Sequence, residues 1–169
     1  WAGYMSLPRE LTESGGKYLQ QPVREVINLR RQTESLPSGR LQESRIIHDN
    51  ALAIEAELCW DTGHTTAEIY GLQLGSGARL LIDQQAGWLT LHRCYPDVDL
   101  DDQQRIRLPA GARISLRIFI DVSSLEVFVN DSGQVLSGRI YPRANDRQLS
   151  LYAAQGEASL LRGELSELR

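Results

Sequence analysis

The clearest pattern in the chain is a period-two alternation of apolar and polar residues, which occurs twice in succession between residues 116 and 130. The apolar positions are Leu116, Ile118, Ile120, Leu125, Val127 and Val129. Arg117 and Phe119 alternate with the first set, and Glu126 and Phe128 alternate with the second. Such alternation, rich in β-branched and aromatic residues, is typical of half-buried antiparallel strands. The polar residues between the two runs favour a turn, so this stretch is predicted to form a β-hairpin.

Strands are predicted along most of the chain after residue 50. The segments are 52–58, 70–74, 80–82, 88–92, 106–108, 114–120, 125–130, 135–140, 149–153 and 159–161, with a last strand at 163–168. Many short strands separated by turn residues are typical of an antiparallel β-sandwich. The predicted fold class is therefore all-β, with two facing sheets rather than a barrel.

Residues 1–21 are predicted to form two short extended segments, Tyr4–Leu7 and Tyr18–Gln20, with a turn at Ser14-Gly15-Gly16. Turns of this composition join antiparallel strands. Two strands alone cannot bury a core. We therefore expect residues 1–20 to pair with an edge of the sandwich or with a neighbouring chain.

A short helix is predicted over Pro22–Arg31, because proline suits the first position of a helix. The residues at helical spacing on one face are Val23, Val26, Ile27 and Arg30. Pro37 and Gly39 then interrupt regular structure. The helix and the residues up to this break are interpreted as a linker.

Composition narrows the class of protein. The chain has 169 residues, of which 41% are hydrophobic and 24% charged, as in ordinary globular domains. Its net charge of −4 argues against a nucleic-acid partner, which favours a basic surface. The sequence contains no apolar run of about 18 residues, so no membrane span is predicted. Because it begins with Trp1 rather than Met, we interpret it as a fragment or a processed product.

Cys59 and Cys94 are the only cysteines, and both fall in or beside predicted strands. A disulfide between them is possible, but two buried thiols in a reducing cytosol are the favoured interpretation. Two cysteines without partnered histidines are a weak metal signal.

The exact amino-acid sequence of the predicted hairpin is more informative than its alternation of apolar and polar residues. The string D-x-S-S-x-E-V-F-V-N-D at residues 121–131, followed by S-x-R-I-Y-P at 137–142, resembles the signature of the C-terminal β-sandwich module of glycoside hydrolase family 32. This family contains the invertases and sucrose-6-phosphate hydrolases. Further pieces that resemble it, in the order of the family, are WAG at 1–3, LPREL at 7–11, LQQPVRE at 19–25, YGLQLG at 70–75 and LSLY at 149–152.

The resemblance implies a jelly-roll-like sandwich of two roughly six-stranded sheets. It divides the chain into a remnant of the last propeller blade (residues 1–21), a linker with a short helix (22–38) and the sandwich (39–169). In the family, the catalytic residues lie in a five-bladed propeller, in motifs of the N-D-P-N, E-C and R-D-P types. None of these strings occurs here. The resemblance therefore implies no catalytic residue, metal ligand or cofactor-binding residue in this chain, and the substrate-binding residues are unknown.

Two pairs of acidic residues were considered for the acid–base chemistry of glycoside hydrolysis, which needs two carboxylates facing one bond. Glu55 and Glu57 share one face of a strand, opposite an apolar face, so we expect both to point into solvent. Asp121 and Glu126 belong to the family motif. We expect Asp121 to cap the turn through the backbone of Ser123 or Ser124. We expect Glu126 to pair with an arginine across the hairpin, such as Arg117.

Other motifs carry little chemistry. Asp97–Asp102 resembles the start of a calcium loop but lacks the required Gly and Glu, so a solvated acidic loop is expected. His48, His64 and His92 have no metal-binding spacing. Gly71–Gly77 lies between strands and has no Walker-type lysine, so phosphate binding is not expected.

Aromatic residues could stack on sugars or fill the core. The candidates are Trp1, Trp60, Trp88, Tyr70 and Tyr95. Core and interface positions are favoured over a sugar platform.

We therefore predict a non-catalytic accessory module of a cytoplasmic bacterial β-fructofuranosidase. Its partner would be the N-terminal five-bladed propeller, which would hydrolyse sucrose or sucrose 6-phosphate without a cofactor. The module would stabilise the propeller and could form a homo-oligomer through an open sheet edge. The alternative is a lectin-like module that binds fructosides.

Overall fold

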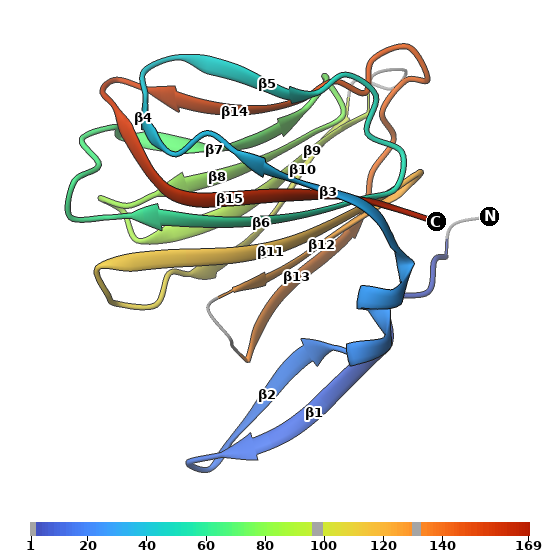
Figure 1. Cartoon of the computed structure of the whole chain (residues 1–169). Helices are drawn as coiled ribbons and strands as arrows, with labels where there is room; N and C mark the ends of the chain where they lie inside the picture. Colours follow the sequence, from blue (N-terminus) through green and yellow to red (C-terminus); the bar gives the residue numbers. More distant parts are fainter. Residues whose placement is uncertain (1–2, 96–99, 130–132) are drawn as a thin grey trace.

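The computed structural model describes residues 3–95, 100–129 and 133–169, and shows two antiparallel sheets packed face to face with a small hairpin beside them (Figure 1). The first sheet has the order β10-β9-β8-β7-β14-β5. Its strands are β5 (Ser44–His48), β7 (Ile69–Leu74), β8 (Ala78–Asp83), β9 (Trp88–Tyr95), β10 (Leu100–Arg107) and β14 (Leu149–Ala154).

The second sheet has seven strands, in the order β13-β12-β11-β6-β15-β3 with β4 paired to β15. Its strands are β3 (Arg30–Leu36), β4 (Gly39–Leu41), β6 (Ile54–Asp61), β11 (Arg113–Asp121), β12 (Ser124–Val129), β13 (Gln134–Arg139) and β15 (Ala158–Leu168). The predicted all-β sandwich of two roughly six-stranded sheets is thus confirmed.

The main core lies between the two sheets. Each of the two alternating runs contributes the side chains of one of its faces to this core. Its members from the central hairpin are Leu116, Ile118, Ile120, Leu125, Val127 and Val129. Trp60 of the seven-stranded sheet meets Tyr70 of the six-stranded sheet edge-on, with ring centroids 5.2 Å apart. This geometry suits the charge distribution of two aromatic rings. Both residues are core residues, as favoured from the sequence.

The N-terminal segment differs from its prediction in position. β1 (Arg9–Ser14) and β2 (Lys17–Pro22) form a separate two-stranded sheet, so the first strand lies later than the predicted Tyr4–Leu7. The predicted turn is present: Gly15 and Gly16 both have positive φ, of 58° and 76°. In Figure 1 this hairpin projects below β13, and β2 contacts that strand.

The predicted helix over Pro22–Arg31 is too long. Only a six-residue 3-10 helix, η1 (Arg24–Leu29), is present, and Arg30 begins β3. Val26 is buried, but Ile27 is exposed because three residues per turn place positions i and i+3, not i+4, on one face. Among the described residues, no helix is long and apolar enough to cross a membrane.

Strands β3, β4 and β5 were not predicted from the pattern. β3 reads RRQTESL and buries only its last residue, because it is an edge strand with solvent beside it. The two predicted strands at 159–161 and 163–168 are one strand, β15, with a register shift between Leu160 and Arg162. Leu52 precedes β6 and is exposed, so it does not belong to the predicted apolar face.

A backbone contact inside the six-stranded sheet yields a test of the fold. Gly71 has a φ of 152°, and a Cβ atom there would lie 2.1 Å from the carbonyl oxygen of Leu80. We expect Gly71→Ala to lower the free energy of unfolding by about 3 kcal/mol, because the clash adds to the backbone strain. Urea denaturation of the purified chain measures this.

Gly39→Ala is the matched control, since Gly39 has a φ of 114° but nothing within 4 Å of its virtual Cβ. Gly39→Ala should lower the free energy of unfolding by only about 1 kcal/mol, the cost of the backbone strain alone. Equal losses in the two variants would contradict the close-approach explanation.

Candidate functional site

The outer face of the seven-stranded sheet, the face turned away from the main core, is covered in part by the N-terminal segment. Glu126 projects from β12 onto this face and is only 3% exposed. Its carboxylate accepts hydrogen bonds from the backbone N–H of Leu7 (2.6 Å) and from Nη2 of Arg9 (2.6 Å). Arg9 also donates to Ser137 in β13 (2.7 Å) and to Gln20 in β2 (2.9 Å). One arginine therefore connects both strands of the hairpin to the sandwich.

A small apolar cluster lies beside this ion pair. Its buried members are Val26, Phe119 and Phe128, and Leu7, Val23, Val135 and Leu168 pack against them. Phe119 and Phe128 meet edge-on with centroids 5.9 Å apart. The outer side of the β11–β12 hairpin is therefore buried as well. The N-terminal segment covers it, rather than the opposite sheet.

The prediction for Glu126 is wrong, and so is the sheet-edge alternative for the N-terminal hairpin, whereas pairing of the hairpin with a neighbouring chain stays a prediction. Glu126 pairs with Arg9 rather than Arg117, because Arg117 lies opposite Phe128 in the hairpin register. The N-terminal hairpin does not pair with a sheet edge in the described residues, where β1 and β2 hydrogen-bond only to each other as strands. Its contacts with the sandwich are made by side chains and by single backbone groups.

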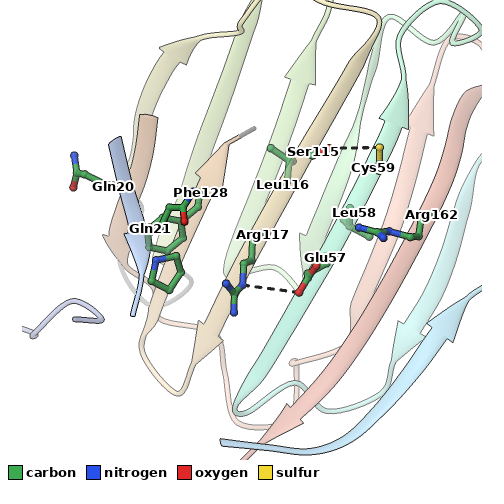
Figure 2. Close-up of a pocket in the computed structure, with 11 residues that line it drawn as sticks. Gln20, Gln21, Glu57, Leu58, Cys59, Ser115, Leu116, Arg117, Phe128 and Arg162 are labelled. Atoms are coloured by element: carbon green, nitrogen blue, oxygen red, sulfur yellow. Dashed lines mark hydrogen bonds and ion pairs between the residues drawn. The ribbon is translucent and has the colours of Figure 1, made fainter. Parts of the chain in front are cut away.

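A groove of about 280 Å³ lies on the same face, between β2 and the middle of the sheet (Figure 2). The residues that line it are Gln20, Gln21, Pro22, Glu57, Leu58, Cys59, Ser115, Leu116, Arg117, Phe128 and Arg162. Arg117, Glu57 and Arg162 come from the neighbouring strands β11, β6 and β15. The groove therefore joins the hairpin to the centre of the outer face.

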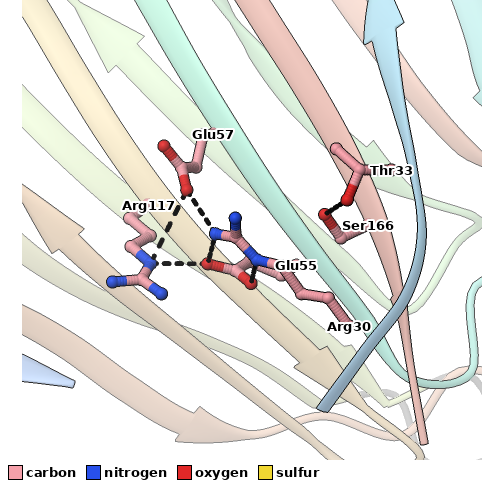
Figure 3. Close-up of polar contacts among 6 residues, drawn as sticks. All are labelled: Arg30, Thr33, Glu55, Glu57, Arg117 and Ser166. Carbon is pink, nitrogen blue, oxygen red and sulfur yellow. Dashed lines mark hydrogen bonds and ion pairs between the residues drawn. The ribbon is translucent and has the colours of Figure 1, made fainter. Parts of the chain in front are cut away.

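An ion cluster borders the groove (Figure 3). Arg30 donates from Nε and Nη2 to the two carboxylate oxygens of Glu55, each at 2.6 Å. Its Nη2 also donates to Glu57 at 2.5 Å, and Nε of Arg117 donates to Glu55 at 2.5 Å. The side chain of Glu55 is 1% exposed. Two arginines from separate strands thus hold one buried carboxylate.

The expectation that Glu55 and Glu57 point into solvent is wrong for Glu55 and holds only in part for Glu57, which is half-buried. Alternation correctly placed both on the outer face. Alternation carries no information on which residues cover that face. In this structure, Arg30 at the start of the edge strand β3 covers part of it.

The charge of Glu55 is stabilised by its partners. Burial by itself would raise the pKa of this carboxyl group, but hydrogen bonds and charge from Arg30 and Arg117 outweigh burial and hold the pKa below its ordinary value. The pKa of Arg30 is raised chiefly by its hydrogen bond to Glu55. Both groups are therefore ionised at neutral pH.

The remaining polar candidates have local roles. Asp121 accepts a hydrogen bond from the backbone N–H of Val122 (2.7 Å), one residue earlier than predicted. His48 lies 3.3 Å from Glu167, and His64 lies 2.8 Å from Asp61. No group of three His, Cys, Asp or Glu side chains in the described ranges is placed to hold a metal ion.

Two loops were also considered from the sequence. In the turn after β7, Ser76 donates its N–H and hydroxyl to Asp146 (2.8 and 2.6 Å), so a carboxylate already occupies these donors. Asp97 and Asp99 of the acidic stretch lie outside the described residues. Asp102 lies in β10 and pairs with Arg93.

The aromatic candidates do not form one platform in the described part of the chain. Trp60 and Tyr70 are buried in the core. Trp88 is covered by the guanidinium groups of Arg105 and Arg107, 4.6 and 3.9 Å from its ring centroid. Tyr95 packs on Tyr141 with centroids 5.0 Å apart, and Trp1 lies outside the described residues.

Cys59 and Cys94 are thiols, not a disulfide, and both are half-buried, so the predicted thiols are present but less buried than expected. Cys59 lines the groove, and its sulfur accepts a hydrogen bond from the hydroxyl of Ser115 at 3.5 Å.

Comparison with solved structures shows that this fold occurs in other proteins. The exo-inulinase of Aspergillus awamori has the same fold, with a TM-score of 0.80 and 18% identity over 97% of this chain and 35% of that chain. The sucrose-6-phosphate hydrolase of Lactobacillus gasseri gives a TM-score of 0.69 and 24% identity over 95% of this chain and 33% of that chain. The structural class is therefore the β-sandwich module present in these solved structures.

Sequence comparison gives the family. The family model "Glycosyl hydrolases family 32 C terminal" matches residues 19–167. The chain is 49% identical to the sucrose-6-phosphate hydrolase of Escherichia coli over 168 residues, covering 99% of this chain and 35% of the relative. It is 48% identical to the raffinose invertase of Escherichia coli, covering 98% of this chain and 35% of that relative. The chain belongs to glycosyl hydrolase family 32 as its C-terminal module, and spans about one third of the relatives it matches.

The ion cluster makes a specific prediction about stability. We expect Glu55→Gln to lower the free energy of unfolding by about 3 kcal/mol, because it leaves the charges of Arg30 and Arg117 without their buried partner. Urea denaturation of the chain measures the change. Glu57→Gln is the control and should cost about 1 kcal/mol or less, since Glu57 is half-buried. A loss below about 0.5 kcal/mol for Glu55→Gln would contradict this role.

The same carboxylate predicts a dependence of stability on pH. Because the pKa of Glu55 is lower in the folded chain than its ordinary value of 4.5, ionised Glu55 stabilises the fold above that value. This contribution is lost as the pH falls from about 5 through the lower folded pKa. We expect Glu55→Gln to show a smaller decrease in unfolding free energy than the unmodified chain between pH 6 and pH 3. Parallel pH profiles for the two proteins would contradict it.

Proposed function

We propose that this chain is the non-catalytic C-terminal module of a β-fructofuranosidase that hydrolyses sucrose or sucrose 6-phosphate. Its function is to dock onto a separate catalytic domain and stabilise it. The family match and the two Escherichia coli relatives, of which the chain covers 35%, support this assignment.

The observation that carries the proposal is the incompletely covered hairpin held on the outer face of the seven-stranded sheet. Arg9 and Glu126 attach it firmly to the sandwich. Leu11 and Tyr18, on the same face of the hairpin as Arg9 by strand register, are nevertheless 67% and 73% exposed. A two-stranded sheet is not stable alone, and exposed apolar side chains favour contact with another surface. We assign that surface to the catalytic propeller, in whose last blade the hairpin would take part.

The state of the acidic residues supports a non-catalytic role. A glycosidase needs one carboxyl group with a raised pKa as the acid and a second carboxylate across the scissile bond. Glu55 has a lowered pKa and is enclosed by Arg30 and Arg117. Glu126 is enclosed by Arg9 and the backbone of Leu7. Neither has the environment of a general acid.

Three expectations stay predictions. Binding of fructosides by the module is the alternative function, although Trp60 and Tyr70 are in the core rather than on a platform. Self-association through a sheet edge is compatible with the edge strand β5, on which Ile46 is 54% exposed. A cytoplasmic location rests on the sequence interpretation.

A hybrid enzyme tests the proposed function. In it, this chain replaces the matching segment of the Escherichia coli sucrose-6-phosphate hydrolase. We expect the hybrid to hydrolyse sucrose 6-phosphate and to be more resistant to thermal inactivation than the same enzyme lacking the matching segment, because docking buries apolar surface on both domains. Release of glucose 6-phosphate and fructose measures activity, before and after heating.

The isolated chain and the intact Escherichia coli enzyme are the controls. Turnover by the isolated chain would contradict a non-catalytic role. A truncated enzyme as active and heat-resistant as the hybrid would contradict stabilisation by the module.

A further inference from the structure

The groove between the hairpin and the outer face offers more hydrogen-bond donors than its own residues use. The side chain of Arg162 makes no hydrogen bond or ion pair with any described residue, and it is exposed. Arg117 uses only Nε in its hydrogen bond to Glu55, so its two Nη groups carry no partner in the described structure. Gln20 uses its amide oxygen to bind Arg9, which leaves its N–H groups.

The carboxylate of the groove is already paired with arginine through one of its oxygens, Oε1 of Glu57. Glu57 is the only carboxylate among the described residues that line it. It accepts from Arg30 at 2.5 Å and lies 4.0 Å from Nε of Arg117. Figure 2 shows Arg117 and Arg162 on either side of Glu57, with Gln20 and Gln21 toward the hairpin. The groove thus has two guanidinium groups with unused donors, and its carboxylate is already paired with an arginine.

A register shift in β15 places Arg162 at this position. The pairing of β15 with β6 changes register between Leu160 and Arg162, so that Arg162 lies opposite Cys59, a groove residue. Leu160 before the shift and Leu165 after it both belong to the core. Bulges of this kind redirect side chains and occur beside functional surfaces. The extra residue thus turns Arg162 toward the outer face.

We propose that Arg117 and Arg162 receive an acidic side chain of the catalytic domain, so that this groove is the polar centre of the docking interface. This inference rests on the proposed function and adds the chemistry of the contact. The occupant is a carboxylate because a planar guanidinium fork matches carboxylate oxygens in pairs. It comes from the catalytic domain because the groove continues directly from the hairpin assigned to that domain, with β2 forming one wall.

The test uses the hybrid enzyme with substitutions at Arg162. We expect Arg162→Gln to lower the midpoint of thermal inactivation by roughly 2–4 °C, and Arg162→Glu to lower it further, because a negative charge would face the partner carboxylate. Arg162→Lys should retain part of the stability. At about 1 M NaCl, where the Debye length falls to about 3 Å, the difference between the Gln and Glu variants should shrink.

Two controls separate an interface contact from a role inside the sandwich. Arg79→Gln removes an exposed arginine from β8, in the other sheet, whose guanidinium lies over the Tyr152 ring of the same module, so it should affect the hybrid no more than the isolated chain. Thermal unfolding of the isolated chain should be unchanged by each Arg162 substitution. Equal losses in the isolated chain and the hybrid, equal effects of Gln and Glu, or no shift in the hybrid would each overturn the proposal. The proposed function is tested separately. It would fail if the truncated enzyme were as active and heat-resistant as the hybrid.

Discussion

Burial of two carboxylates on the outer face of the seven-stranded sheet controls how the N-terminal segment is attached. Removing a carboxylate from water is costly unless a cation and hydrogen-bond donors replace the water. Glu126 obtains these from Arg9 and the backbone of Leu7, and Glu55 obtains them from Arg30 and Arg117. Arg9 and Arg30 lie before or at the first strand of the sandwich. If the segment left the face, Glu126 would lose Arg9 and the Leu7 backbone, whereas Glu55 would keep Arg30 and Arg117 of the sandwich.

This arrangement gives the module two buried layers with different chemistry. The layer between the sheets is almost entirely aliphatic and aromatic, and determines the fold. The layer on the outer face combines ion pairs with a small cluster around Phe119 and Phe128. Ion pairs are directional, whereas apolar contacts are not, so the second layer is suited to holding a segment in one orientation. A module that positions a neighbouring domain benefits from such a contact.

A catalytic domain docked on the outer face would contact the part of that face that the hairpin leaves uncovered. The hairpin covers the end of the sheet near β12 and β13, and the groove beside it extends across β11, β6 and β15. The six-stranded sheet would then face away from the catalytic domain.

Much of the fold was determined by the sequence alone, because period-two alternation reports directly which side of a strand is buried between two sheets. The strands at 114–120 and 125–130, the all-β class and the family resemblance came from such local patterns and motifs. β3 was missed because an exposed edge strand has no apolar side to alternate. The partners of Glu55 and Glu126 were decided only by the tertiary structure. Arg9 and Glu126 are separated by 117 residues, and local sequence patterns carry no information on which distant segment covers an outer face.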